Sequence, residues 1–261
     1  MSIDLTDFER GVPFSGDAEA AISSLQDRIA RLQLSQIVHR KRSIVLFEGW
    51  TGSNKKNALK KLVGALCPTH VRVVNVASSD EADADRHWLA PFWSRIPSAG
   101  DTTVFYRSWY RRMFEDRALS KLDDKRWARA CDEINEFEAQ QRDHGTMITK
   151  LFFHVTAERQ AANLREWQED PWLRHLKDLQ PAVGLGQRER AMEVLCDFFK
   201  HTNTRWAPWQ IIDDNDATAG CISALTAIAD QLEKSMPAEP PAADETVVQF
   251  RSPKAPEQTR A

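Results

Sequence analysis

The residues best suited to chemistry lie in a turn at residues 48–54 that is rich in glycine and polar residues, and in the two lysines that follow it. Residues 43–47, before the turn, form a short apolar run typical of a strand buried on both faces. Residues 55–66, at its end, place apolar side chains at helical spacing. Backbone N–H groups at the start of a helix, together with a lysine, bind phosphate oxygens. The sequence therefore indicates either a phosphate site or a plain strand-to-helix connection.

The turn partly matches the phosphate-binding pattern G-x-x-x-x-G-K-[ST]. Gly49 and Lys55 occupy the first glycine and the lysine of that pattern. Asn54 replaces its second glycine, and Lys56 replaces its hydroxyl residue. The residues that we predict to bind phosphate in this turn are Gly49, Gly52, Ser53, Asn54, Lys55 and Lys56.

A second basic cluster follows the predicted strand at residues 102–106, where the sequence reads Arg-Ser-Trp-Tyr-Arg-Arg. In parallel α/β sheets, ligands gather outside the carboxyl ends of the strands. Guanidinium groups pair with phosphate oxygens through two parallel hydrogen bonds. We therefore predict phosphate contacts from Arg107, Arg111 and Arg112.

Structural roles remain open for several of these side chains. Arg107 is also placed to pair with Glu48 across the ends of two strands. Trp109 and Tyr110 are of a type that more often fills a core than stacks on a ligand.

Two acidic segments offer substitute metal ligands, although acidic loop residues are more often simply solvated. They contain Asp80, Glu81, Asp83, Asp85, Asp213, Asp214 and Asp216.

The elements that must position these residues alternate between strands and helices. Apolar runs predict strands at residues 43–47, 71–76, 102–106, 147–155 and 209–212. Helical spacing predicts helices at residues 18–38, 55–66, 87–96, 126–143, 156–167, 191–201 and 217–232. Alternating strands and helices form a parallel α/β sheet through crossover connections. The predicted organisation is a mobile arm at residues 1–17, one domain at residues 18–235 and a disordered tail at residues 236–261.

Composition limits the class of protein. With 261 residues, 42% of them hydrophobic, the chain is long enough for one sizeable domain. Its net charge of −3, with acids and bases interspersed, offers no broad basic surface for nucleic acid. The sequence has neither a run of about 18 apolar residues nor an apolar amino-terminal segment, which argues against a membrane span or a secretory signal. Four widely spaced cysteines without metal-site spacing indicate reduced thiols, so we predict a cytoplasmic protein.

Several short motifs stand along the chain in a specific order. They are Arg31-Leu32-Gln33, Phe47-Glu48-Gly49, Lys55, Ile96–Gly100, Phe105, Arg107–Tyr110, Arg112, Glu136–Glu138, Lys150, Phe152, Gln160, Asp170-Pro171 and Ala207–Trp209. At this spacing they resemble the polyphosphate kinase 2 family over residues 22–232. The Arg-Ser-Trp-Tyr block and the late Ala-Pro-Trp are the most specific of them.

The resemblance implies a fold, an activity and partners. The fold is α/β, a P-loop kinase-like three-layer sandwich with a central, mainly parallel five-stranded sheet and a helical lid. The activity is phosphoryl transfer between inorganic polyphosphate and nucleotides, with Mg²⁺, usually in an oligomer. In such an enzyme Lys55 and Arg107 would be the catalytic residues, because they would bind the transferred phosphate. Neither nucleic acid nor a membrane is expected as a partner.

Departures from the family's pattern bear on activity. The loop aspartate of the family corresponds to Thr51, and its strand-end aspartate corresponds to Tyr106. Those carboxylates look like the ones that place magnesium and the acceptor phosphate, and Mg²⁺ requires hard anionic oxygens. The lid arginines of the family likewise correspond to Asn163 and Trp167. No metal ligand is therefore predicted at these positions.

Two functions remain open. The first is a polyphosphate kinase 2-like phosphotransferase whose activity is weak or lost, with Mg²⁺ as cofactor if it is active. The second is a catalytically inactive member that binds polyphosphate or a nucleotide, as a homo-oligomer or in a complex with an active relative. Another P-loop kinase, such as a nucleoside monophosphate kinase, would share the turn but not the Arg-Ser-Trp-Tyr and Ala-Pro-Trp blocks.

Overall fold

The computed structural model describes residues 3–76, 86–120, 122–176 and 185–240. In this part of the chain, five parallel strands form one sheet in the order β2-β3-β1-β4-β5. The strands are β1 (Arg42–Gly49), β2 (Val71–Asn75), β3 (Thr102–Tyr106), β4 (Thr146–His154) and β5 (Trp209–Asp213). All five strands predicted from apolar runs are present. Because they run parallel, their carboxyl ends meet at one edge of the sheet.

β1 is the central strand, paired with β3 on one side and with β4 on the other. It is buried throughout residues 43–48. Successive side chains of a strand point to opposite faces. Ile44 and Leu46 accordingly join the core on one face of the sheet, and Val45 and Phe47 join the core on the other. This burial on both faces explains the continuous apolar run.

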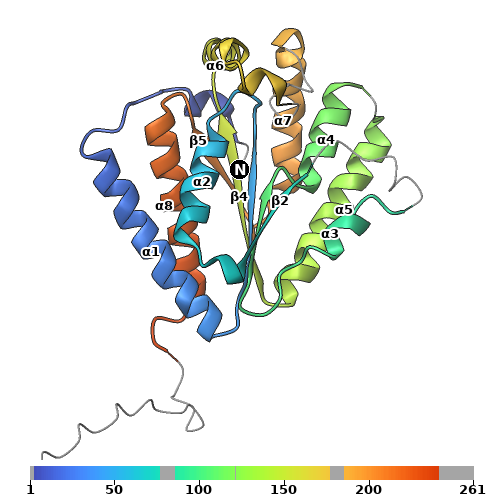
Figure 1. The fold of residues 1–261 in the computed structure, drawn as a ribbon. Coiled ribbons are helices and arrows are strands. Elements are labelled where there is room, and N and C mark those ends of the chain that lie inside the picture. Colours follow the sequence, from blue (N-terminus) through green and yellow to red (C-terminus); the bar gives the residue numbers. More distant parts are fainter. Residues whose placement is uncertain (1–2, 77–85, 121, 177–184, 241–261) are drawn as a thin grey trace, which may run out of the picture.

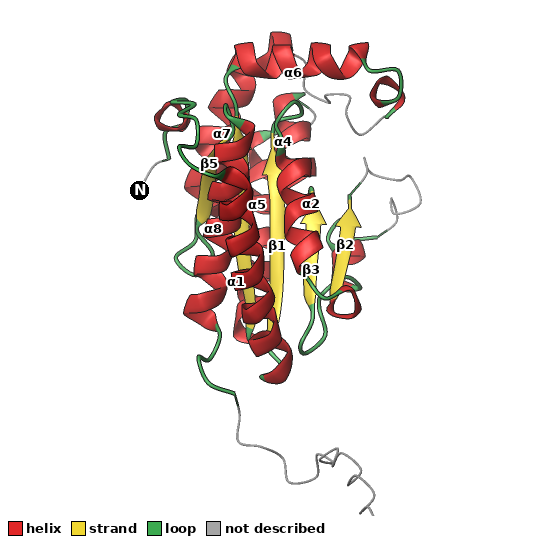
Figure 2. Cartoon of the chain, turned by 60° about the vertical axis from the view of Figure 1, so that its left-hand side comes forward, coloured by secondary structure: helices red, strands yellow, loops and turns green. Residues whose placement is uncertain are grey.

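Helices cover both faces of the sheet (Figure 1). One layer consists of α1 (Ala18–Val38), α2 (Lys55–Ala65) and α8 (Ala217–Ser235). The other consists of α3 (Ala90–Trp93), α4 (Trp109–Ala118), α5 (Asp124–Asp143) and α7 (Arg188–Thr202). Helix α6 (Ala157–Glu169) lies across the carboxyl ends of the strands (Figure 2). The predicted three-layer α/β sandwich is confirmed.

Helix α4 is an element that the apolar pattern does not predict. Ser108 caps its first turn, because its side chain accepts a hydrogen bond from the N–H of Tyr110. The neighbouring prediction of a helix at residues 87–96 is too long, since α3 covers Ala90–Trp93. The remaining predicted helices agree with the structure to within a few residues.

The sequence predicts a mobile arm at residues 1–17, and several of its described residues contact the domain. It contains the 3-10 helix η1 (Leu5–Phe8), and the Leu5 side chain is buried in the core. The Gly11 N–H donates a 2.8 Å hydrogen bond to Asp213 at the end of β5. The described part of this arm thus contacts the carboxyl edge of the sheet through a hydrogen bond at the end of β5.

At the other end, the predicted tail at residues 236–261 is described as far as Pro240. The Pro237 carbonyl accepts a 2.8 Å hydrogen bond from Ser35 of α1. The acidic residues Asp80, Glu81, Asp83 and Asp85 lie outside the described residues. Among the helices that the structure describes, none is both long and apolar enough to cross a membrane.

Candidate functional site at the β1–α2 turn

Two glycines shape the turn between β1 and α2. Gly49 has φ +130°, and a Cβ there would overlap the backbone of Phe153 on β4. Gly52 has φ +101°, and a Cβ there would lie 2.9 Å from Gln160 Cγ on α6. Both glycines therefore meet two demands, a conformation that side chains disfavour and a close approach to a neighbouring element. The predicted strand, turn and helix are all present.

Lys55, the first residue of α2, points back into this turn. Its ammonium donates to the carbonyl oxygens of Trp50 (2.6 Å) and Gly49 (3.2 Å) and to Ser53 Oγ (3.4 Å). The side chain is only 2% exposed. Burial lowers the pKa of Lys55 to about 7, and the charge of Arg107 contributes to this shift.

The backbone amides of the two residues before α2 also have partners within the protein. The Ser53 N–H donates to the Trp50 carbonyl (3.2 Å). The Asn54 N–H donates to Oδ2 of Asp214, which follows β5. Asp214 is fully buried, and this burial raises the pKa of its carboxyl to about 7. The sequence analysis considers Asp214 as a metal ligand or a solvated residue, and neither alternative includes this contact. Its position directly after a strand does indicate that it lies at the carboxyl edge of the sheet, where ligands gather.

Tyr106, the last residue of β3, lies beside two cations. The Lys55 ammonium is 5.7 Å from the centre of its ring, and the Arg107 guanidinium is 5.4 Å from it. Arg107 is 5% exposed and has φ +63°, which is uncommon for a residue other than glycine. Its N–H donates to the Phe47 carbonyl on β1 (3.0 Å). Both predicted catalytic residues thus meet around an aromatic face.

Glu48 supplies a buried carboxyl beside these cations. It accepts hydrogen bonds from the N–H and the hydroxyl of Ser108, both 2.6 Å long. Burial raises the pKa of Glu48, while Ser108 and the charges of Lys55 and Arg107 act in the opposite direction. Arg107 therefore influences Glu48 through its charge, and the hydrogen bonds described for Glu48 come from Ser108.

The other predicted phosphate ligands differ in how close they lie to the turn. Arg111 lines the same hollow as Glu48 but donates to Glu115 (2.8 Å) and to the Val76 carbonyl (2.8 Å). Lys56 is half-buried on α2. The backbone of Arg112 belongs to α4, and its side chain lies outside the described part of the chain.

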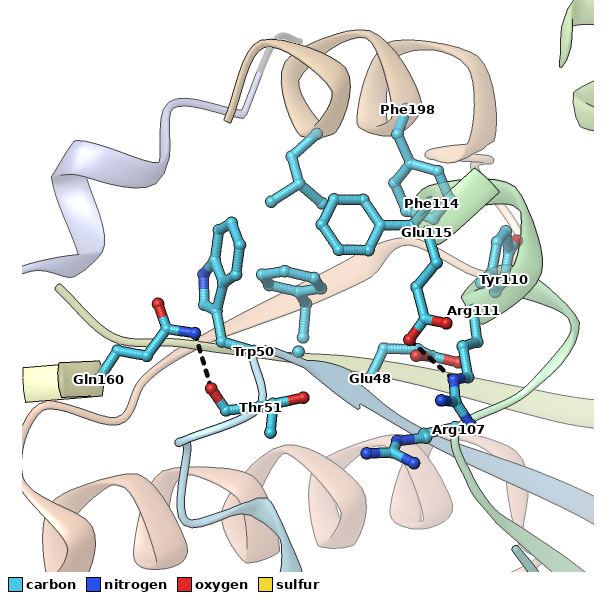
Figure 3. A pocket seen from close by; sticks show the side chains of 13 residues that line it. Glu48, Trp50, Thr51, Arg107, Tyr110, Arg111, Phe114, Glu115, Gln160 and Phe198 are labelled. Atoms are coloured by element: carbon cyan, nitrogen blue, oxygen red, sulfur yellow. Dashed lines mark hydrogen bonds and ion pairs between the residues drawn. The ribbon is translucent and has the colours of Figure 1, made fainter. Parts of the chain in front are cut away.

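A small cavity separates the turn from α4 and α7 (Figure 3). Charged residues line one side of it, and Trp50 and Phe198 contribute to its apolar wall. Its volume is about 30 Å³. That volume accommodates about two water molecules, so the described conformation is closed around the turn.

Helix α6 closes the site from above by binding the turn directly. The side-chain amides of Gln160 and Asn163 donate to the carbonyl oxygens of Thr51 and Gly52, each at 2.7 Å. Arg188 of α7 donates to Gln160 Oε1 and lies 4.2 Å from the centre of the Trp50 ring. The side chain of Asn163, which the sequence analysis places in the lid, therefore connects α6 to the turn.

Comparison with known proteins decides the ancestry of this site. A model of the family described as "Polyphosphate kinase 2 (PPK2)" matches residues 15–240. This chain belongs to the polyphosphate kinase 2 family.

Relatives in the family include named phosphotransferases. The chain is 29% identical over 229 residues to the polyphosphate:AMP phosphotransferase of Acinetobacter johnsonii, a match that covers 88% of this chain and 47% of that protein. It is 27% identical over 222 residues to ADP-polyphosphate phosphotransferase 2 of Rhizobium meliloti, covering 84% of this chain and 70% of that one. The chain thus spans about half the length of the first of these relatives and more of the second.

Solved structures of the family confirm the fold. Polyphosphate kinase 2 from Arthrobacter aurescens TC1 superposes with a TM-score of 0.83 at 21% identity, covering 93% of this chain and 89% of that chain. A putative polyphosphate kinase 2 from Pseudomonas aeruginosa superposes with a TM-score of 0.78 at 25% identity, covering 88% of this chain and 51% of that chain.

The Arg-Ser-Trp-Tyr block that suggested the family serves the core in two of its positions. Trp109 Nε1 and the Tyr110 hydroxyl donate to Glu138 Oε1, at 3.1 and 2.7 Å. Lys150 of β4 donates to Glu138 Oε2 (3.0 Å) and to the Tyr110 oxygen (3.1 Å). Trp109 and Tyr110 are at most 1% exposed, so the core alternative holds for both.

Mg²⁺, which the resemblance implies, does not fit the residues present at positions 51 and 106. Thr51 has its carbonyl taken by Gln160, and Tyr106 presents an aromatic face to two cations. Mg²⁺ prefers carboxylate oxygens and retains several waters. Within the described ranges, no three His, Cys, Asp or Glu side chains are grouped so that they could hold a metal ion.

Proposed function

We propose that this chain is a polyphosphate kinase 2 family protein in which phosphoryl transfer between inorganic polyphosphate and nucleotides is weak or lost. The observation that carries the proposal is that the cation and the amide of the turn are bonded within the protein and that no carboxylate stands at two expected positions. The Lys55 ammonium and the Asn54 amide are bonded to protein acceptors, and positions 51 and 106 hold no carboxylate. The relatives named for such transfer supply the reaction class.

The physical reason lies in how phosphoryl transfer is catalysed. It depends on positioning and on neutralising charge over the transferred group. Loss of one metal-binding carboxylate would slow the reaction on the order of a thousandfold, or about 4 kcal/mol. Here two such positions depart from the family, as Thr51 and Tyr106. The chain retains Lys55 and Arg107 but has no carboxylate at positions 51 and 106 to coordinate a metal ion.

The retained cations still suit an anion. In this proposal Lys55 and Arg107 would contact the phosphate nearest the turn, because the cations of both lie close to the Tyr106 ring. Phosphates further along a chain would meet Lys56, Arg111 and Arg112. The turn would contribute the backbone of Gly49, Gly52, Ser53 and Asn54. If any transfer persists, Mg²⁺ would have to come bound to the substrate phosphates.

A transfer assay tests the proposal. The chain would be incubated with polyphosphate and each of AMP, ADP, GMP and GDP, in Mg²⁺ or Mn²⁺, beside a Lys55→Met control. We expect turnover close to that of the control. We expect a Thr51→Asp, Tyr106→Asp double variant to rise by at least about tenfold if it stays folded by circular dichroism. Turnover of the unmodified chain a hundredfold or more above the control would contradict the proposal.

A second candidate is a non-catalytic partner of an active relative. It is favoured by the match to only 47%, 43% and 39% of the length of three polyphosphate:AMP phosphotransferases. A domain of this family can thus occur within a longer chain. Sedimentation velocity would show whether the 29.8 kDa chain self-associates or joins an active family member. A monomer that leaves the active member's rate unchanged would contradict this candidate.

A further inference from the structure

Asp214 places a carboxylate at the amino terminus of α2. It follows β5, and its own N–H donates to the His154 carbonyl of β4 at 2.8 Å, which fixes its backbone beside the turn. Its Oδ2 accepts the N–H of Asn54, the N-cap residue directly before α2. The Asn54 side chain makes no capping bond of its own. The helix is therefore capped by a residue 160 positions away.

The second oxygen of this carboxylate has no stabilising partner. Asp214 Oδ1 is buried and accepts no hydrogen bond from any described residue. Gly220 of α8 faces it, and a Cβ at Gly220 would overlap Oδ1 and lie 3.1 Å from Asp214 Cα. Burying a carboxylate with an unsatisfied oxygen costs free energy. Stability of the fold alone thus gives no account of this arrangement.

The position of the carboxylate is one that suits a phosphate oxygen. The amino terminus of a helix attracts anions through its free N–H groups and its dipole. Here the N–H of Asn54 is already bonded, and the charge of Asp214 acts on Lys55. An incoming phosphate would have to displace the carboxylate from Asn54 and would be repelled by it.

We propose that the Asp214 carboxylate is an internal competitor that occupies the phosphate position at the amino terminus of α2 and so sets the anion affinity of the turn. The inference rests on the proposed function only in treating the turn as a site for polyphosphate or nucleotide phosphates. Gly220 provides the space in which the carboxylate sits. Removal of the negative charge at position 214 leaves the Asn54 N–H without a charged acceptor and removes the repulsion of an incoming phosphate.

Calorimetric titration with inorganic tripolyphosphate, without divalent metal, tests the competition. The variants are Asp214→Asn, which removes the charge and keeps the size, and Asp214→Ser, which removes the charge and leaves more room. We expect both to bind tripolyphosphate about tenfold or more tightly than the unmodified chain. Asp216→Asn, which removes the same charge two residues away and keeps an α8 cap, should stay within about twofold.

The amide resonance of Asn54 gives a second readout on the same samples. We expect tripolyphosphate to shift it in both Asp214 variants at concentrations that leave the unmodified chain unchanged. Folded Asp214 variants that bind no more tightly than the unmodified chain would overturn the inference, as would an equal gain in Asp216→Asn. Because no turnover is measured, this result is independent of whether the chain transfers phosphate.

Discussion

Two buried lysines of this domain have opposite surroundings. Lys150 of β4 is fully buried, and its ammonium donates to Glu138 (3.0 Å), to the Tyr110 oxygen and to the Thr202 carbonyl (2.8 Å). Lys55 is buried nearly as deeply, but its three acceptors are neutral oxygens of its own turn. Burial lowers the pKa of both ammonium groups. For Lys150 the hydrogen-bonded Glu138 carboxylate opposes this shift. For Lys55 the charge of Arg107 adds to it, and the charges of Glu48 and Asp214 oppose it without a hydrogen bond to the ammonium among those described.

The difference separates a structural lysine from one available to a ligand. A buried ion pair with complete hydrogen bonds is fixed, because removing either partner leaves an unpaired charge. A lysine held by carbonyl oxygens gains a stronger partner when an anion arrives. Both lysines carry the family resemblance, so the same sequence signature contains a core ion pair and a candidate site.

The largest expected effect comes from breaking the core pair. Glu138→Gln or Lys150→Met should each lower the free energy of unfolding by about 3–5 kcal/mol, since each leaves a buried charge without its partner. Urea unfolding followed by tryptophan fluorescence measures this. Glu136→Gln, on the exposed side of the same helix, serves as the matched control and should change it by less than about 0.5 kcal/mol.

A double replacement sharpens that test. Glu138→Leu combined with Lys150→Met removes both charges and should recover much of the stability lost by either single change. If the single variants unfold at the same urea concentration as Glu136→Gln, the pair does not stabilise the core, and the contrast between the two lysines is lost.

The sequence predicts the sheet well because its signals are local. Each strand is a short apolar run, and the central one is apolar because both of its faces are covered. Helix α4 escapes prediction because basic and acidic residues interrupt its apolar pattern, and a single serine cap is a weak signal in isolation. The arm at residues 1–17 looks mobile by composition, yet its described part has a buried leucine and polar contacts with the domain, among them Gly11 to Asp213 and Glu9 to His154.

The site is predicted in part, for a related reason. The place of Gly49, Lys55 and Arg107 in the fold follows from local patterns, namely a strand, a turn and a basic cluster, while their role in binding phosphate stays a prediction. Asp214 and Gln160 reach the turn from distant points in the chain, and only the parallel order of the strands and the crossing of α6 bring them there. The direction of the Lys55 ammonium is set by burial and by the carbonyl oxygens of the turn, which no residue pattern encodes.

The pH dependence of stability gives an intermediate effect. In the folded chain Lys55 titrates near a pKa of about 7, below its ordinary value of 10.5, so between these values the unfolded chain holds more protons. Stability must then rise with pH across this window, and the penalty of burying the charged lysine is complete below it. Between pH 7.5 and 9.5 the unmodified chain should gain about 1–3 kcal/mol relative to Lys55→Met.

Urea unfolding at pH 7.5, 8.5 and 9.5 measures this difference. Lys150 is present in both proteins, so its own titration cancels. Asp214, whose pKa is raised to about 7, is largely charged in both states over this range. Lys60→Met, an exposed position on α2, is the control: it retains Lys55, so its stability should rise with pH as much as that of the unmodified chain. Equal slopes for Lys55→Met and the unmodified chain would contradict the lowered pKa of Lys55 and therefore its burial in the turn.

The smallest expected effect concerns the contact between the lid helix and the turn. Asn163→Ala removes the 2.7 Å hydrogen bond to the Gly52 carbonyl. This should lower the free energy of local opening of α6 by about 1 kcal/mol and leave the sheet unaffected, because the bond joins only α6 and the turn. Amide hydrogen exchange should therefore quicken within α6 by about fivefold while β1 and β4 keep their protection. Glu166→Ala, exposed on the same helix, should leave the exchange of α6 unchanged. If exchange rises equally across the sheet, the Asn163 side chain stabilises the whole fold, and α6 does not open independently of the turn that contains Lys55.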